Sequence, residues 1–106
     1  MVLLDDKPTP SCLMPASLAQ GCEIRTVEGL GAGDTLNTIQ QALEACDAVQ
    51  CGMCFPGVLM SLTALLARVP APGEDAVRDA LVGNICRCTG YEQIVEAALA
   101  AREEPR

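Results

Sequence analysis

The sequence contains no histidine and no tryptophan, and it has one phenylalanine and one tyrosine. Without histidine, the chain holds no mixed cysteine–histidine zinc site, no Cys–His nucleophile pair and no Ser–His–Asp triad of its own. A core so poor in aromatic residues must be filled by Leu, Val, Ala, Ile and Met, which suit close helix packing better than a large sheet. In a chain of 106 residues, such a core favours a stabilising metal.

Basic residues are also few, with 7 against 14 acidic residues and a net charge of −7. This balance argues against nucleic-acid binding, which needs a basic footprint, and against an anionic membrane surface. The longest apolar stretch, 58–69, is interrupted by Ser61, Thr63 and Arg68 and is too short to span a bilayer. The first residues have no basic segment and no long apolar segment, so they do not resemble a signal peptide. We therefore expect a cytoplasmic location.

Cysteine, in contrast, is abundant, with seven residues in the chain. The number is odd, and in the reducing cytosol clustered cysteines more often bind metal or perform redox chemistry than form disulfides. Four of them form two close pairs, Cys51-x-x-Cys54 and Cys86-x-Cys88, separated by 31 residues. That separation accommodates one helical hairpin, which would bring the pairs together. The spacing predicts that four thiolates hold one metal centre.

From residue 34 onward the pattern is helical. Apolar residues recur on one stripe in each segment, and prolines and glycines mark the ends. Thr89 and Glu92 have the spacing of a capping box at the start of the last helix. The four expected helices run from Asp34 or Thr35 to Cys46, from Pro56 to Val69, from Glu74 to about residue 82, and from Gly90 to about Arg102. Their short connections predict a four-helix bundle over residues 34–102.

Residues 1–30 have a different character. Pro8 and Pro10 limit the first apolar run to an edge or irregular strand, and residues 23–27 alternate polar and apolar as a short strand does. The glycine-rich segment 29–33 is interpreted as a linker, because it lacks the ending of a phosphate-binding loop. A few short strands do not make a stable sheet alone, so this region is predicted to be part of something larger or to need a partner.

Spacing alone leaves three interpretations of the cysteine pairs open. The first is a [2Fe–2S] cluster, the second a structural zinc ion with four cysteine ligands, and the third a set of free cysteines or a redox pair. Each pair precedes a predicted helix, whose N-terminal N–H groups and dipole stabilise an anionic site. The C-x-C spacing of the second pair fits the common zinc pattern poorly.

The complete strings around the cysteines are more specific. The strings QCGMCFPG at 50–57 and GNICRCTGY at 83–91 closely resemble the small iron–sulfur subunit of the molybdenum hydroxylases, the family of xanthine dehydrogenase, aldehyde oxidoreductase and carbon monoxide dehydrogenase. The resemblance runs from residue 1 to about residue 101. It implies an oxidoreductase subunit that does not itself act on substrate. It also implies a helical [2Fe–2S] domain preceded by a short β remnant of a plant-type ferredoxin domain.

The resemblance also implies the roles of individual residues. The cluster ligands fall on Cys51, Cys54, Cys86 and Cys88, and Gln50 and Cys88 take the positions that face the pterin of the partner subunit. Electrons would pass from a molybdenum–pterin centre in a large subunit, through the cluster, toward FAD in a further subunit or domain. The alternative is a zinc-stapled or metal-free helical interaction module without a redox role.

Cys12 matches the fourth ligand of the family's second, ferredoxin-type cluster. Eleven residues precede it, and the family has the same spacing between its third and fourth ligands. The first three ligands of that cluster have no counterpart in the sequence, so Cys12 is expected to be an orphan ligand. Cys22 and Cys46 are expected to be ordinary small core or surface residues.

Overall fold

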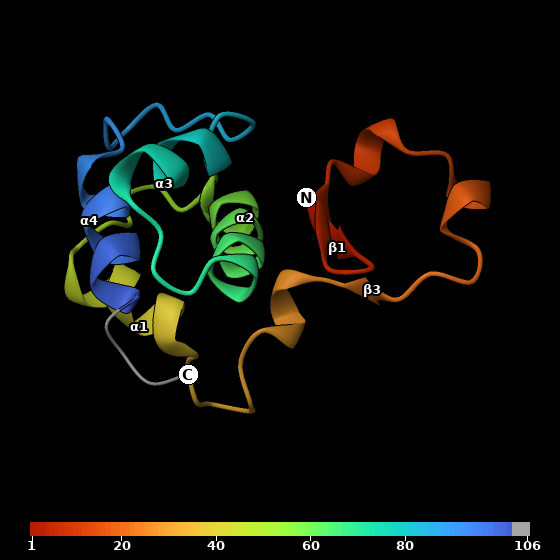
Figure 1. The fold of residues 1–106 in the computed structure, drawn as a ribbon, viewed down its shortest axis with the longest axis horizontal. Helices are drawn as coiled ribbons and strands as arrows, with labels where there is room; N and C mark the ends of the chain where they lie inside the picture. Colours follow the sequence, from red (N-terminus) through yellow and green to blue (C-terminus); the bar gives the residue numbers. More distant parts are fainter. Residues whose placement is uncertain (103–106) are drawn as a thin grey trace.

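The computed structural model describes residues 1–102 and places a group of four α-helices beside a small sheet (Figure 1). The predicted fold class is confirmed: a helical domain is preceded by a short β segment. The elements in chain order are β1 (Val2–Leu4), β2 (Lys7–Thr9), η1 (Ser11–Leu13), η2 (Ala16–Ala19), β3 (Ile24–Arg25), η3 (Val27–Gly29), α1 (Thr38–Ala45), α2 (Phe55–Arg68), α3 (Glu74–Ala80) and α4 (Glu92–Ala101).

The three strands form an antiparallel sheet in the order β2-β1-β3. Leu3 of β1 pairs with Pro8 of β2 on one side and with Arg25 of β3 on the other. Strand β2 lies at the edge, as Pro8 requires, because proline has no N–H to offer a further strand. Leu3 is only 2% exposed, so the sheet is anchored through its central strand.

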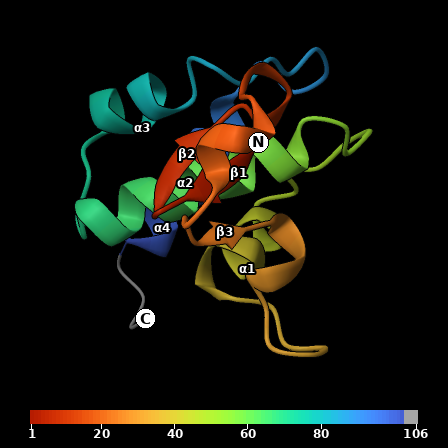
Figure 2. The ribbon, with the colours of Figure 1, turned by 90° about the vertical axis from the view of Figure 1, so that its right-hand side faces the viewer.

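Helix α2 lies between the sheet and the other helices. It contacts β1, β2 and η3 on one side and α1 and α3 on the other, and the strands lie in front of α2 in Figure 2. The single apolar stripe predicted for this helix is therefore too narrow. Val69, the predicted end of the helix, follows it and is 38% exposed. A helix covered on two sides buries residues around most of its circumference, here Val58, Leu59, Met60, Ser61, Leu62, Leu65 and Leu66.

Helices α1, α3 and α4 complete the core around α2. Helix α1 packs along α4, and α3 contacts both α2 and α4. The predicted start of α1 at residue 34 or 35 is wrong, because Asn37 and Gln40 form a reciprocal capping box. The Asn37 side chain accepts from the Gln40 N–H at 3.0 Å, and the Gln40 side chain accepts from the Asn37 N–H at 2.8 Å. No helix within residues 1–102 is long and apolar enough to cross a membrane.

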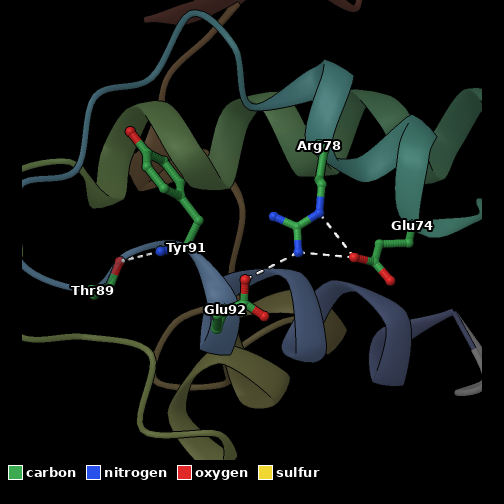
Figure 3. Close-up of polar contacts among 5 residues, drawn as sticks. All are labelled: Glu74, Arg78, Thr89, Tyr91 and Glu92. Atoms are coloured by element: carbon green, nitrogen blue, oxygen red, sulfur yellow. Dashed lines mark hydrogen bonds and ion pairs between the residues drawn. The ribbon is translucent and has the colours of Figure 1, made fainter.

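The capping box predicted for Thr89 and Glu92 is also wrong. Helix α4 begins at Glu92, and its N-cap Tyr91 is in the left-handed region with φ 71°. Glu92 pairs instead with Arg78, which also pairs with Glu74 (Figure 3). The N–H of Tyr91 donates to the Thr89 Oγ1 at 3.2 Å. Two successive positive φ values, at Gly90 (67°) and Tyr91, turn the chain so that Thr89 lies outside the helix.

Candidate metal centre

The two cysteine pairs lie on two loops that each lead into a helix. Cys51 and Cys54 precede α2, with Cys54 at its N-cap position, and Cys86 and Cys88 lie in the connection between α3 and α4. Gly52 has φ 82°, a conformation that favours glycine and allows the first loop to turn between its two cysteines. Because Cys54 stands at the N-cap of α2, the partial positive charge of that helix N-terminus lies beside its thiol.

The loops bring the cysteines together across the two pairs. The Cys54 thiol lies against Cys86, and burial together with a hydrogen bond to Cys86 raises the pKa of Cys54 to about 11. The Cys88 thiol interacts with Cys51, and that hydrogen bond raises the pKa of Cys88. The predicted meeting of the two cysteine stretches is therefore present in the fold.

Several hydrogen-bond donors surround the Cys86 sulfur. The Thr89 hydroxyl lies 3.0 Å from the Cys86 Sγ. This contact and the backbone N–H groups of Thr89 and Cys88 lower the pKa of Cys86 to about 7, and burial opposes them. The neighbouring Cys54 has the opposite shift, because burial raises its pKa and the hydrogen bond to Cys86 raises it further. Thiolates are the form that binds metal, so these donors prepare Cys86 to act as a ligand.

The donor set of the two loops consists of cysteine thiols. In the described part of the chain, no three Cys, Asp or Glu side chains come together closely enough to hold one metal ion. Two cross-loop thiol pairs, with no carboxylate among them, match the chemistry of iron–sulfur ligation by four cysteines.

The second loop is held in shape by the only tyrosine of the chain. The Tyr91 hydroxyl accepts a hydrogen bond from the Cys86 N–H at 2.8 Å and donates one to the Asn84 carbonyl at 2.9 Å. These bonds join both ends of the segment that leads into the cysteine pair. Tyr91 therefore fixes the backbone from which the Cys86 side chain projects.

Asn84 attaches the same loop to α2. It is 7% exposed, and its side-chain amide donates to the Ser61 Oγ at 2.8 Å. A Cβ on Gly57 would collide with the Asn84 side chain, so the absence of a side chain at Gly57 allows the loop to pack on the first turn of α2. Gly57 itself lies within α2.

The other predicted site residues lie at the surface. Gln50 is exposed immediately before the first pair, and Cys88 is exposed within the second. Cys12 is exposed in η1 and, with Cys54, lines a cavity of about 260 Å³ between the sheet segment and the cysteine loops. The structure thus places Cys12 and Cys54 on the lining of one cavity.

Sequence reasoning missed the roles of Asn84, Thr89 and Tyr91. All three lie in the string that carries the resemblance, but their contacts depend on how the loop folds back on α2. One signal was present: a single tyrosine in an aromatic-poor chain, placed three residues after a cysteine pair. Tyrosine in a partly buried position usually finds a hydrogen-bond partner, and here it finds two.

Comparisons with known proteins agree with this site. Residues 26–99 match the family described as "[2Fe-2S] binding domain". The chain is 48% identical over 100 residues to the nicotine 6-hydroxylase small subunit of Paenarthrobacter nicotinovorans, covering 94% of this chain and 60% of that protein. It is 47% identical over 103 residues to the xanthine dehydrogenase iron-sulfur-binding subunit of Escherichia coli O157:H7, covering 92% of this chain and 63% of that protein.

Solved structures of related proteins have the same fold as this chain. Quinoline 2-oxidoreductase from Pseudomonas putida 86 superposes with a TM-score of 0.91 at 46% identity, covering 96% of this chain and 64% of that chain. Aldehyde oxidoreductase from Desulfovibrio desulfuricans ATCC 27774 superposes with a TM-score of 0.90 at 41% identity, covering 95% of this chain and 12% of that one. The chain thus spans less than two thirds of the length of the relatives it matches.

Proposed function

Because the chain belongs to the [2Fe–2S]-binding domain family, and within it to the iron–sulfur components of the molybdenum hydroxylases, we propose that it is an electron-transfer subunit of a molybdenum-dependent oxidoreductase. Its homologues are components of oxidoreductase enzymes, and one [2Fe–2S] cluster is the cofactor that the family assigns to it. The proposed route runs from a molybdenum–pterin centre through this cluster toward FAD.

The proposed ligands are Cys51, Cys54, Cys86 and Cys88. The observation that carries this assignment is the pairing of the thiols across the two loops, Cys54 with Cys86 and Cys51 with Cys88. Each iron of a [2Fe–2S] cluster takes two of four cysteine sulfurs, and the chain supplies two such pairs. Cys12 is proposed to remain outside this cluster, as the orphan ligand of a second one.

The chain's own residues prepare the site for an anionic cofactor. When bound, the cluster supplies reversible one-electron chemistry. The N–H of Met53 donates to the Cys51 sulfur at 3.5 Å, and the donors around Cys86 stabilise its thiolate. The hydrogen bond from Asn84 to Ser61 holds the second loop against α2. These contacts orient the sulfurs before any metal arrives, which lowers the cost of assembling the centre.

The partners are proposed from the same relationship. Relatives described as small or iron-sulfur-binding subunits suggest a large molybdopterin-binding subunit and an FAD-binding subunit. Gln50 and Cys88, both exposed, are proposed to face the pterin of the large subunit. We propose residues 34–102 as the cluster-binding domain, residues 1–30 as a ferredoxin-type segment, and the cytoplasm as the location.

The test is a redox measurement on the full chain after anaerobic assembly with iron and sulfide. We expect a coloured protein that takes up one electron reversibly and shows an EPR signal only when reduced. Cys51→Ser should lose the signal, whereas Cys22→Ser, a matched change outside the two pairs, should retain it. A colourless chain that binds zinc alone, with no reducible centre, would favour the interaction module and overturn the proposal.

A further inference from the structure

Thr89 makes two polar contacts at the edge of the second cysteine pair. Its Oγ1 lies 3.0 Å from the Cys86 Sγ, and the same oxygen accepts a hydrogen bond from the Tyr91 N–H at 3.2 Å. Figure 3 shows the Tyr91 contact at the start of α4. The backbone of the turn therefore holds the threonine hydroxyl in place beside the sulfur.

The direction of the contact between Thr89 and Cys86 follows from the chemistry of a metal ligand. A cysteine that binds metal is a thiolate and has no proton to donate. The threonine hydroxyl has one O–H donor and two acceptor lone pairs. Since the Tyr91 N–H uses one of these lone pairs, the Thr89 proton is free to point at the sulfur. In the cluster-bound chain, Thr89 donates and Cys86 accepts.

Thr89 also differs in kind from the other groups that bond the four sulfurs. Within residues 1–102, it is the only side chain other than cysteine that makes a hydrogen bond to any of them. The remaining donors are backbone N–H groups or other thiols, and a substitution does not remove a backbone donor. Thr89 is therefore the position at which the hydrogen bonding of the cluster is set by the choice of residue.

Resting on the function proposed above, we propose that Thr89 is a positioning residue that raises the reduction potential of the [2Fe–2S] cluster through Cys86. Hydrogen bonds to ligand sulfurs tune the potential of iron–sulfur centres. Reduction places more negative charge on the ligands, and a hydrogen bond to a charged acceptor is stronger than one to a neutral acceptor. The Thr89 hydroxyl thus stabilises the reduced state more than the oxidised state.

The experiment compares midpoint potentials of the reconstituted full chain and its variants, by spectroelectrochemical titration followed by EPR. Thr89→Val removes the hydroxyl and keeps the shape, and its midpoint should shift to more negative values. Thr89→Ser keeps the hydroxyl and should restore the wild-type midpoint. Thr63→Val is the matched control, because the buried Thr63 hydroxyl has no hydrogen-bond partner among the described residues, and its midpoint should not move.

The outcomes separate this inference from the proposed function. If the wild-type chain takes up no iron and sulfide, the proposed function fails and this inference fails with it. If the wild type loads and Thr89→Val loads with an unchanged midpoint, only the inference is overturned. Thr89→Ala is the second variant, because it also removes the hydroxyl and its side chain is smaller than that of threonine. If neither Val nor Ala at this position retains a cluster while Ser does, Thr89 serves assembly and the tuning role is refuted.

Discussion

Replacing Tyr91 with phenylalanine removes the hydroxyl that bonds the backbone of Asn84 and Cys86 in the second cysteine loop, while leaving the ring in place. The change deletes two hydrogen bonds, from the Cys86 N–H at 2.8 Å and to the Asn84 carbonyl at 2.9 Å. Each such bond contributes about 0.5–1.5 kcal/mol net, so the free energy of unfolding should fall by about 1–3 kcal/mol. The backbone groups left behind are partly buried, which supports the upper part of that range.

The assay is thermal unfolding of the cluster-loaded Tyr91→Phe chain, followed by far-ultraviolet circular dichroism under anaerobic conditions. For a domain of this size, 1 kcal/mol corresponds to about 4–8 °C in the unfolding midpoint, so a decrease of at least about 4 °C is expected. Cluster release to a chelator should also be faster, because the segment carrying Cys86 is less restrained. A midpoint within experimental error of the wild type, with unchanged cluster release, would refute the role assigned to Tyr91.

Two further predictions concern packing and thiol reactivity. Gly57→Ala should lower the free energy of unfolding by about 1–3 kcal/mol in a denaturation series, as overpacking does, because its Cβ collides with Asn84. Gly83→Ala, whose Cβ meets nothing within 4 Å, is the control, and equal stability of the two variants would contradict the clash. In the cluster-loaded chain, iodoacetamide should modify the exposed Cys12 before Cys46 at neutral pH. Burial, followed by the charges of neighbouring acidic residues, raises the pKa of Cys46, so its modification should accelerate only as the pH rises further. Mass spectrometry showing Cys46 modified first would contradict this order.

Much of the helical domain could be predicted because its signals are local. Pro56 at the start of α2 and the prolines after Arg68 bound that helix in the sequence as they do in the structure, and the start of α3 at Glu74 is as predicted. The width of the buried face of α2 could not be predicted, because it depends on the sheet packing against it from the far N-terminal segment. Leu59 and Met60 are both buried in this face.

The cysteine site, like the fold, has features that could be predicted from the sequence and features that could not. The cysteine spacing predicted two pairs that meet, and the fold brings Cys54 to Cys86 and Cys51 to Cys88. The residues that hold the loops together were not predictable from spacing. The capping-box pattern at Thr89 was misleading because Gly90 and the next residue turn the chain through positive φ values, and that turn directs the Thr89 hydroxyl to Cys86 instead of to a helix N–H.

The central claim, that four cysteines of this chain hold one [2Fe–2S] cluster, is tested most directly by metal and sulfide analysis. The full chain is assembled anaerobically with iron, sulfide and equimolar zinc, and iron, zinc and acid-labile sulfide are counted per chain. The account predicts about two irons and about two sulfides, the content of one such cluster, in the wild type and in Cys12→Ser, and neither iron nor sulfide in Cys86→Ser. One zinc with no sulfide, or iron content that falls in Cys12→Ser and stays in Cys86→Ser, would contradict it.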